Sequence, residues 1–285
     1  MRFNLFNGRP YLESNYKFYK LNGVYTVSNG DGSKRSLNYY KNGIVDSVYT
    51  AWYPNGKIQV EGKYSEGIKT GTWKYYYYNG QVSDIELYVD GKLDGPDIQY
   101  DERGAIDKEN VYKNGELNGA TRIYGDNGQI MVVFYYKNDN IEGYSYEDKT
   151  GKLVPMIPLV KGAGTVDSYY KNGVKSAHMV FSEGVVDGDR ILYSTNGKEQ
   201  VVGSRVNGLE NGSKKIYYPS GKIMKEENYY YGARHGSCKY YDENGSLISD
   251  LNYYLDNLHG DCKYYTAGKL SHTYTYYYGE LESKK

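Results

Sequence analysis

The chain of 285 residues has few of the residues that build disulfide frameworks, membrane spans or dry aromatic cores. It contains 2 cysteines, 6 prolines and 5 phenylalanines. Two cysteines cannot form a disulfide framework, and no stretch approaches the roughly 18 consecutive apolar residues of a membrane helix. Residues 1–8 also lack an apolar run long enough for a signal peptide. We therefore expect a cytoplasmic protein.

An excess of charge of either sign is also lacking. The 35 lysines and arginines balance 35 aspartates and glutamates, and the balance holds along the whole chain. A protein that binds nucleic acid or an anionic membrane through its charge needs a concentrated basic face. We therefore expect neither nucleic acid nor a membrane as a partner.

Tyrosine and glycine are abundant instead, with 39 and 35 residues. Tyrosine can bury its ring while its hydroxyl stays in contact with water, whereas phenylalanine suits a dry core. The mean hydropathy of −0.78 would allow disorder, but disordered chains are poor in aromatic residues. The composition therefore predicts an ordered but thin structure with half-exposed rings.

The glycines recur at a fixed period. One series advances in steps of 22–24 residues and indicates about eleven repeats that cover residues 8–279, with an irregular repeat at 152–173 and short terminal caps. We expect a single repeat array over residues 1–285. The series consists of Gly8, Gly32, Gly56, Gly80, Gly104, Gly128, Gly151, Gly173, Gly197, Gly221, Gly245 and Gly268.

Each repeat contains two turns separated by runs of strand length. In Tyr53-Pro54-Asn55-Gly56 the proline cannot adopt a positive φ, so the sequence predicts a type I turn closed by a left-handed glycine and a bulge. The segment from Gly67 to Gly71 predicts a second, wider loop. Because no window shows a helical period, we expect an all-β fold. It should be one elongated, twisted, antiparallel sheet of about eleven 24-residue hairpins.

Aromatic residues stand at equivalent positions of successive repeats. A hairpin folded at the wide loop would place Tyr64 roughly opposite Tyr76, and such cross-strand pairs are worth about 0.2–1 kcal/mol each. Two interpretations follow: the rings pack within the sheet, or they form an aromatic surface for a ligand. The candidate surface comprises Tyr64, Tyr76, Tyr88, Tyr100, Tyr112 and Tyr124.

The repeat resembles a known family. The pattern of residues 53–58 followed by residues 64–76 is similar to the MORN repeat in its bacterial and viral variant, and His-Gly at 235–236 and 259–260 fits the second turn of that variant. The resemblance implies an elongated antiparallel sheet of hairpins that acts as a non-enzymatic binding or scaffold module. Antitoxin components are known among the bacterial members.

The sequence contains no pattern typical of an enzyme. It has neither a phosphate-binding loop nor a nucleophile with a base and an orienting residue, so we expect no catalysis and no cofactor. Two His-x-x-Cys motifs, at 235–238 and 259–262, resemble half-sites for zinc. Equivalent residues of adjacent hairpins lie about 9–10 Å apart, however, whereas a zinc ion needs ligands within about 2.0–2.3 Å. We therefore expect free thiols and no metal.

Residues 153–160 break the pattern with eight consecutive apolar residues. Pro155 and Pro158 each remove a donor of the strand ladder, so this segment must be an edge, a bulge or a break. It is either a bend packed on adjacent hairpins or an exposed patch that binds a partner. The candidate contact residues are Val154, Met156, Ile157 and Leu159.

These observations favour a non-catalytic scaffold that binds a protein, in an antitoxin-like or structural role. The alternative is recognition of glycans or lipid headgroups through the exposed tyrosine rows.

Overall fold

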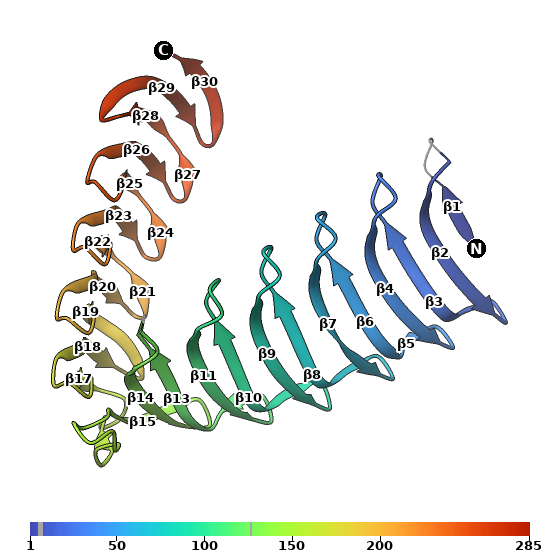
Figure 1. The fold of residues 1–285 in the computed structure, drawn as a ribbon, viewed down its shortest axis with the longest axis horizontal. Coiled ribbons are helices and arrows are strands. Elements are labelled where there is room, and N and C mark those ends of the chain that lie inside the picture. The colour runs from blue at the N-terminus through green and yellow to red at the C-terminus, as the bar shows by residue number, and fades with distance from the viewer. Residues whose placement is uncertain (5–7, 126) are drawn as a thin grey trace. The chain divides into compact units, whose positions relative to one another are not determined.

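The computed structural model describes residues 1–4, 8–125 and 127–285, and these residues form strands and turns without a helix (Figure 1). The prediction of an all-β fold built from successive hairpins is confirmed. Strands that follow one another along the chain pair as antiparallel neighbours, as expected for an up-and-down order.

The strands form two sheets, so the prediction of a single sheet was wrong. The first sheet contains β1 (Arg2–Asn4), β2 (Pro10–Lys17), β3 (Lys20–Ser28), β4 (Lys34–Lys41), β5 (Ile44–Val45), β6 (Ser47–Trp52), β7 (Ile58–Ser65), β8 (Ile68–Tyr76), β9 (Val82–Val89), β10 (Lys92–Tyr100), β11 (Ile106–Lys113), β12 (Glu116–Leu117), β13 (Gly119–Tyr124), β14 (Ile130–Lys137), β15 (Asn140–Ser145) and β16 (Ile157–Pro158). The second contains β17 (Gly164–Tyr169), β18 (Lys175–Ser182), β19 (Val185–Tyr193), β20 (Glu199–Val206), β21 (Leu209–Glu210), β22 (Gly212–Tyr217), β23 (Ile223–Tyr230), β24 (Ala233–Arg234), β25 (Gly236–Tyr241), β26 (Leu247–Tyr254), β27 (Asn257–Leu258), β28 (Gly260–Thr266), β29 (Lys269–Tyr277) and β30 (Glu280–Lys284).

The interruption lies at the irregular repeat, between β16 and β17. Strand β16 has 2 residues and includes Pro158, which cannot donate a hydrogen bond to a further strand. By compactness the chain divides into one unit of residues 1–128 and 135–139 and a second unit of residues 129–134 and 140–285. Strands β16 and β17, which lie on either side of the break, therefore both belong to the second unit.

A buried apolar cluster beside the break was not predicted from the sequence. Val132 and Val133 of β14 are fully buried, and Phe134 of β14 packs on Phe181 of β18 with ring centroids 5.6 Å apart. The Oγ of Ser176 donates a hydrogen bond to the carbonyl oxygen of Met131 at 2.5 Å. Within the second unit, β14 and β18 thus form a core although they belong to different sheets.

The first turn of the repeat has the predicted geometry. The amide of Gly56, at φ +81°, donates to the carbonyl of Tyr53 at 2.9 Å, and the amide of Tyr53 donates to the carbonyl of Lys57 at 2.9 Å. The pairing of β6 with β7 shifts register beside this turn, as a bulge requires.

The second turn is tight, so the prediction of a wide loop was wrong. Ser65 pairs with Ile68, and the two residues between them, Glu66 and Gly67, have φ values of +50° and +84°. Positive φ at both positions defines the type I′ turn that matches the twist of the strands. Tyr64 therefore pairs with Lys69 and not with Tyr76.

Hydrogen bonds join the turns of successive repeats. At the first turn, a tyrosine hydroxyl donates to a backbone carbonyl 23 residues later, at distances of 2.6–2.7 Å. These pairs are Tyr53 with Tyr76, Tyr77 with Tyr100, Tyr170 with Tyr193, and Tyr218 with Tyr241. At the tight turn, a glycine amide donates to a carbonyl of the preceding repeat, as Gly67 does to Val45 at 2.8 Å and Gly232 to Glu210 at 2.8 Å. In the repeats that make both bonds, both ends of the hairpin are thereby fixed to a neighbour.

A second part of the core is a column of buried side chains that runs along the array. It is formed by the residue that lies seventeen positions after the first-turn glycine, and the residue type varies from repeat to repeat. This core column includes the buried residues Trp73, Asp97, Thr121, Ser145, Ser168, Cys238 and Cys262. Two polar members of the column, Asp97 and Thr121, form hydrogen bonds with the side chain of Asn110, which lies between them. Asn110 donates to Asp97 at 2.8 Å and accepts from Thr121 at 3.1 Å.

Trp73 occupies its place in the core column because residue 62 is a glycine. A Cβ at Gly62 would lie 2.2 Å from the indole ring, whereas at Gly203, the equivalent position of a later repeat, it would lie 3.4 Å from Lys214. We predict that Gly62→Ala lowers the free energy of unfolding by about 1–3 kcal/mol, because overpacking forces the ring to move. Gly203→Ala should change it much less. Urea denaturation of both variants tests this, and equal losses would contradict it.

Asp97 generates a pH dependence of stability. Burial raises the pKa of this carboxyl, and repulsion from Glu86 and Asp84 raises it further. The hydrogen bond from Asn110 lowers the pKa, but the net shift is upward. The folded state therefore binds this proton more tightly than the unfolded state, so the free energy of unfolding falls as the pH rises through the raised pKa. We predict that Asp97→Asn is more stable than the wild type at pH 7. The advantage should shrink toward about pH 4, near the unperturbed pKa of Asp, in melting curves recorded against pH.

Candidate binding surfaces

The histidines and cysteines of the two His-x-x-Cys motifs lie in different places. Cys238 and Cys262 are free and fully buried in the core column. The rings of His235 and His259 both lie against one tyrosine, Tyr254, with ring centroids 5.1 and 5.8 Å away and the ring planes tilted. In the part of the chain that the structure describes, no group of three or more His, Cys, Asp or Glu side chains is placed to hold a metal.

The predicted aromatic surface of six tyrosines is half-buried throughout. The hydroxyls of Tyr76, Tyr88 and Tyr124 donate to glutamates at 2.6, 2.9 and 2.9 Å. Burial and the neighbouring glutamate raise the pKa of both Tyr76 and Tyr88 to about 12. Tyr64 packs edge-on against Trp73 at 5.0 Å. These polar groups and faces are therefore engaged inside the sheet.

The apolar run at the break is divided between packing and exposure. Of the four predicted contact residues, Met156 is 46% exposed and Val154 and Ile157 are half-buried. Leu159 is 4% exposed, so its side chain belongs to the packing and not to a surface. Strand pairing holds the run in place, since Ile157 pairs with Tyr144.

Two further apolar residues of the run, Leu153 and Val160, are 40% and 71% exposed. Together with Met156 they form what we call the edge patch. The edge patch flanks β16, which pairs with β15 and is the last strand of the first sheet. The edge patch is thus an exposed apolar surface at a sheet edge.

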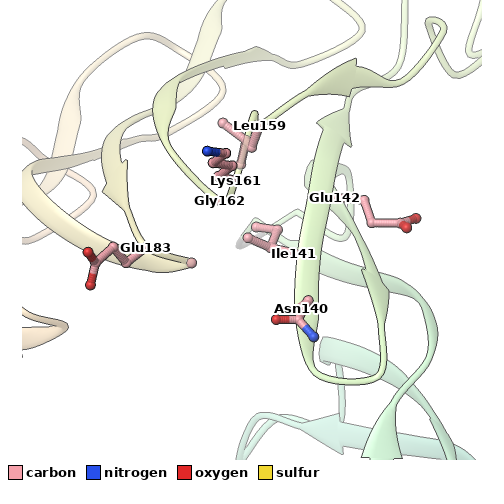
Figure 2. Close-up of a pocket in the computed structure, with 8 residues that line it drawn as sticks. Asn140, Ile141, Glu142, Leu159, Lys161, Gly162 and Glu183 are labelled. Carbon is pink, nitrogen blue, oxygen red and sulfur yellow. The ribbon is translucent and has the colours of Figure 1, made fainter.

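The ladder of tight turns is interrupted beside the edge patch. The amide of Gly162 donates to Leu159 within its own turn, at 3.1 Å, and not to the preceding repeat. A cavity of about 550 Å³ lies here, lined by Asn140, Ile141, Glu142, Leu159, Lys161, Gly162, Glu183 and Gly184. Figure 2 shows the carboxylates of Glu142 and Glu183 pointing to opposite sides. The two carboxylates therefore do not converge in the cavity as the paired acids of a catalytic site would.

A continuous row of exposed rings in the last repeats was missed by the sequence analysis. Tyr230, His235, Tyr254, His259 and Tyr277 follow one another with centroid distances of 5.9, 5.1, 5.8 and 5.4 Å. The three tyrosines are 56%, 40% and 56% exposed. We call these five rings the Tyr–His row. The signal in the sequence was the combination of a tyrosine at the end of a strand with a histidine before the next glycine.

Comparison with known proteins confirms the family resemblance. The family model of the MORN repeat variant matches residues 45–66, 69–90, 210–229 and 234–253. Segments similar to the MORN repeat variant therefore lie in both units. Repeats of this kind, in an all-β array of hairpins, fit a binding or scaffold module.

Other comparisons add little. No curated protein matches the chain. Two of the solved structures that match are entitled "Crystal Structure of TcdB2-TccC3" and "Crystal Structure of TcdB2-TccC3-Cdc42", at 12% and 10% identity and TM-scores of 0.19 and 0.17. The matches cover 92% and 94% of this chain but only 18% and 19% of those chains. Likenesses this weak carry no argument. None of the described residues belongs to a helix long and apolar enough to cross a membrane.

The burial of the two thiols predicts their reactivity. Burial raises the pKa of both Cys238 and Cys262, so the reactive thiolate is scarce at neutral pH. We predict that neither thiol reacts with Ellman's reagent in the native protein and that both react after unfolding in guanidinium. A chelator should leave the melting temperature unchanged. Rapid labelling of the folded protein, or a loss of stability in the chelator, would contradict this arrangement.

Proposed function

We propose that the protein is a non-catalytic scaffold that binds a protein partner at the edge patch. The observation that supports this most is the exposure of Leu153, Met156 and Val160, three apolar residues of one short segment. An exposed apolar cluster at a free strand edge is typical of a surface that a partner covers. The buried core nearby, formed by β14 and β18, provides a rigid base for it.

The repeat architecture suits this role. Strand pairing of Ile157 with Tyr144 holds the patch to its neighbour, so the surface is ordered before binding, and a partner loses little affinity to the cost of ordering it. Polar groups of the core column bond to one another within the sheet. The column thus serves packing and supplies no reactive set.

An antitoxin-like role would be one instance of this function, and a structural role in a larger assembly would be another. In the antitoxin-like case the partner is a toxin, and the gene of the toxin should lie next to that of the scaffold. Inspection of the neighbouring genes distinguishes the two instances.

The test is a pair of substitutions in the edge patch. Met156→Asp with Val160→Asp places two charges on exposed positions, so we predict that partner binding is lost while the melting temperature changes little. Partners captured from native lysate by the tagged wild type and by the variant are compared by mass spectrometry.

Val89→Asp serves as the matched control, because Val89 is an apolar residue at a strand end in another repeat and is 50% exposed. It should keep the partner that the wild type captures. If the double variant also keeps that partner, the edge patch is not the binding surface. If it unfolds, the run is core and the proposal fails.

A further inference from the structure

We infer that the Tyr–His row is a binding site for an uncharged, extended β-linked polysaccharide. This goes beyond the proposed function and concerns a different surface, in the last three repeats of the second unit.

The row presents three exposed tyrosine rings with half-buried histidines between them. Tyr231 and Tyr278, at the tips of two of the tight turns, extend it and lie 4.9 and 4.7 Å from Tyr230 and Tyr277. Their side chains are 53% and 49% exposed. The exposed tyrosines of the row present both apolar ring surface and polar hydroxyls to one ligand. A sugar ring has the same two aspects, an apolar face of C–H groups and an equatorial edge of hydroxyls.

The fold does not require aromatic residues at these positions. The tips of the tight turns have positive φ, and at the place of Tyr231 and Tyr278 other repeats carry Asn114 and Asn207. Asparagine tolerates this conformation, whereas a bulky side chain is strained in it. Tyr231, Leu255 and Tyr278 nevertheless adopt φ values of +45°, +48° and +46°. Strain retained at exposed rings indicates a function for those rings.

The chemistry of the row favours an uncharged ligand. The five rings carry no carboxylate or ammonium group, and the neighbouring Arg234 and Asp256 neutralise each other in an ion pair of 2.9 Å. The guanidinium of Arg234 also stacks on Tyr253, at 4.1 Å from the ring centroid. An anionic ligand would find no free cation in this pair, and a cationic ligand would find no free carboxylate.

The spacing of the row matches an extended glycan. Equivalent residues such as Tyr230 and Tyr254 are separated by two strand spacings, about 9–10 Å. An extended β-linked chain advances by a similar length for each disaccharide. One tyrosine would thus meet one face of every second sugar, with a histidine between successive tyrosines.

The experiment is calorimetric titration of the full chain with cellobiose and cellohexaose. We expect cellohexaose to bind and cellobiose to bind at least tenfold more weakly, because the shorter sugar reaches only one repeat. The variant Tyr230→Ser with Tyr254→Ser should weaken cellohexaose binding at least tenfold. Serine stands at the equivalent positions 65 and 182, so the variant should fold.

Tyr78→Ser is the matched control, because Tyr78 is 58% exposed but lies in a first turn far from the row in the sequence. It should leave cellohexaose binding unchanged. If the double variant unfolds, Tyr278→Asn replaces it, since asparagine relieves the positive φ and removes a ring. That variant should keep its stability and lose affinity.

Several results would overturn the inference. These are no binding of cellohexaose at millimolar concentration, unchanged binding by the row variants, or stronger binding of the polyanion heparin. A further contrary result is that the row variants lose the protein partner and not the sugar, which would make the row a protein interface. The edge-patch variants keep cellohexaose binding in either case, so the two proposals fail separately.

Discussion

The structure depends on the hydrogen bonds that join turns of one repeat to the neighbouring repeat. A hairpin on its own is only marginally stable in water, and the column of buried side chains in this chain is too thin to change that. The tyrosine hydroxyls at the first turn and the glycine amides at the tight turn provide donors whose acceptors lie in the adjacent repeat. Stability is therefore shared between nearest neighbours, as in other repeat proteins.

This constraint explains the composition. Tyrosine is preferred to phenylalanine because residues such as Tyr53 and Tyr218 must bury a ring and still donate a hydrogen bond. The tight turns need two residues with positive φ, which is why glycine recurs there. The core column, by contrast, tolerates Trp73, Asp97 and Cys238 at equivalent positions, because its local partners adapt to each of them.

Much of the fold could be predicted from the sequence, since glycine spacing and proline geometry are local signals. Pro54 was sufficient to define the first turn. The tight turn was missed because Glu66, a residue that rarely has a positive φ, occupies its first position. The division into two sheets was left open, because Pro155 and Pro158 indicated an edge, a bulge or a break without deciding among them. The core beside the break could not be predicted, because it depends on contacts over long sequence distances, such as Phe134 with Phe181.

The candidate sites were harder to predict. Residues 153–160 were recognised as exceptional, but the sequence could not show that Leu159 turns inward while Val160 is exposed, since alternation is absent from the run. The Tyr–His row was overlooked because its members are neither a motif nor a column of one residue type. They become a surface only when the turns of adjacent repeats lie side by side.

Amide hydrogen exchange at the tight-turn glycines tests the central claim most directly. Gly67, Gly91, Gly115, Gly208 and Gly232 each donate to the preceding repeat, so their amides should exchange as slowly as strand amides. Exchange at the rates of exposed turn amides would show that the bonds between repeats are not maintained, and would contradict this account of what holds the array together.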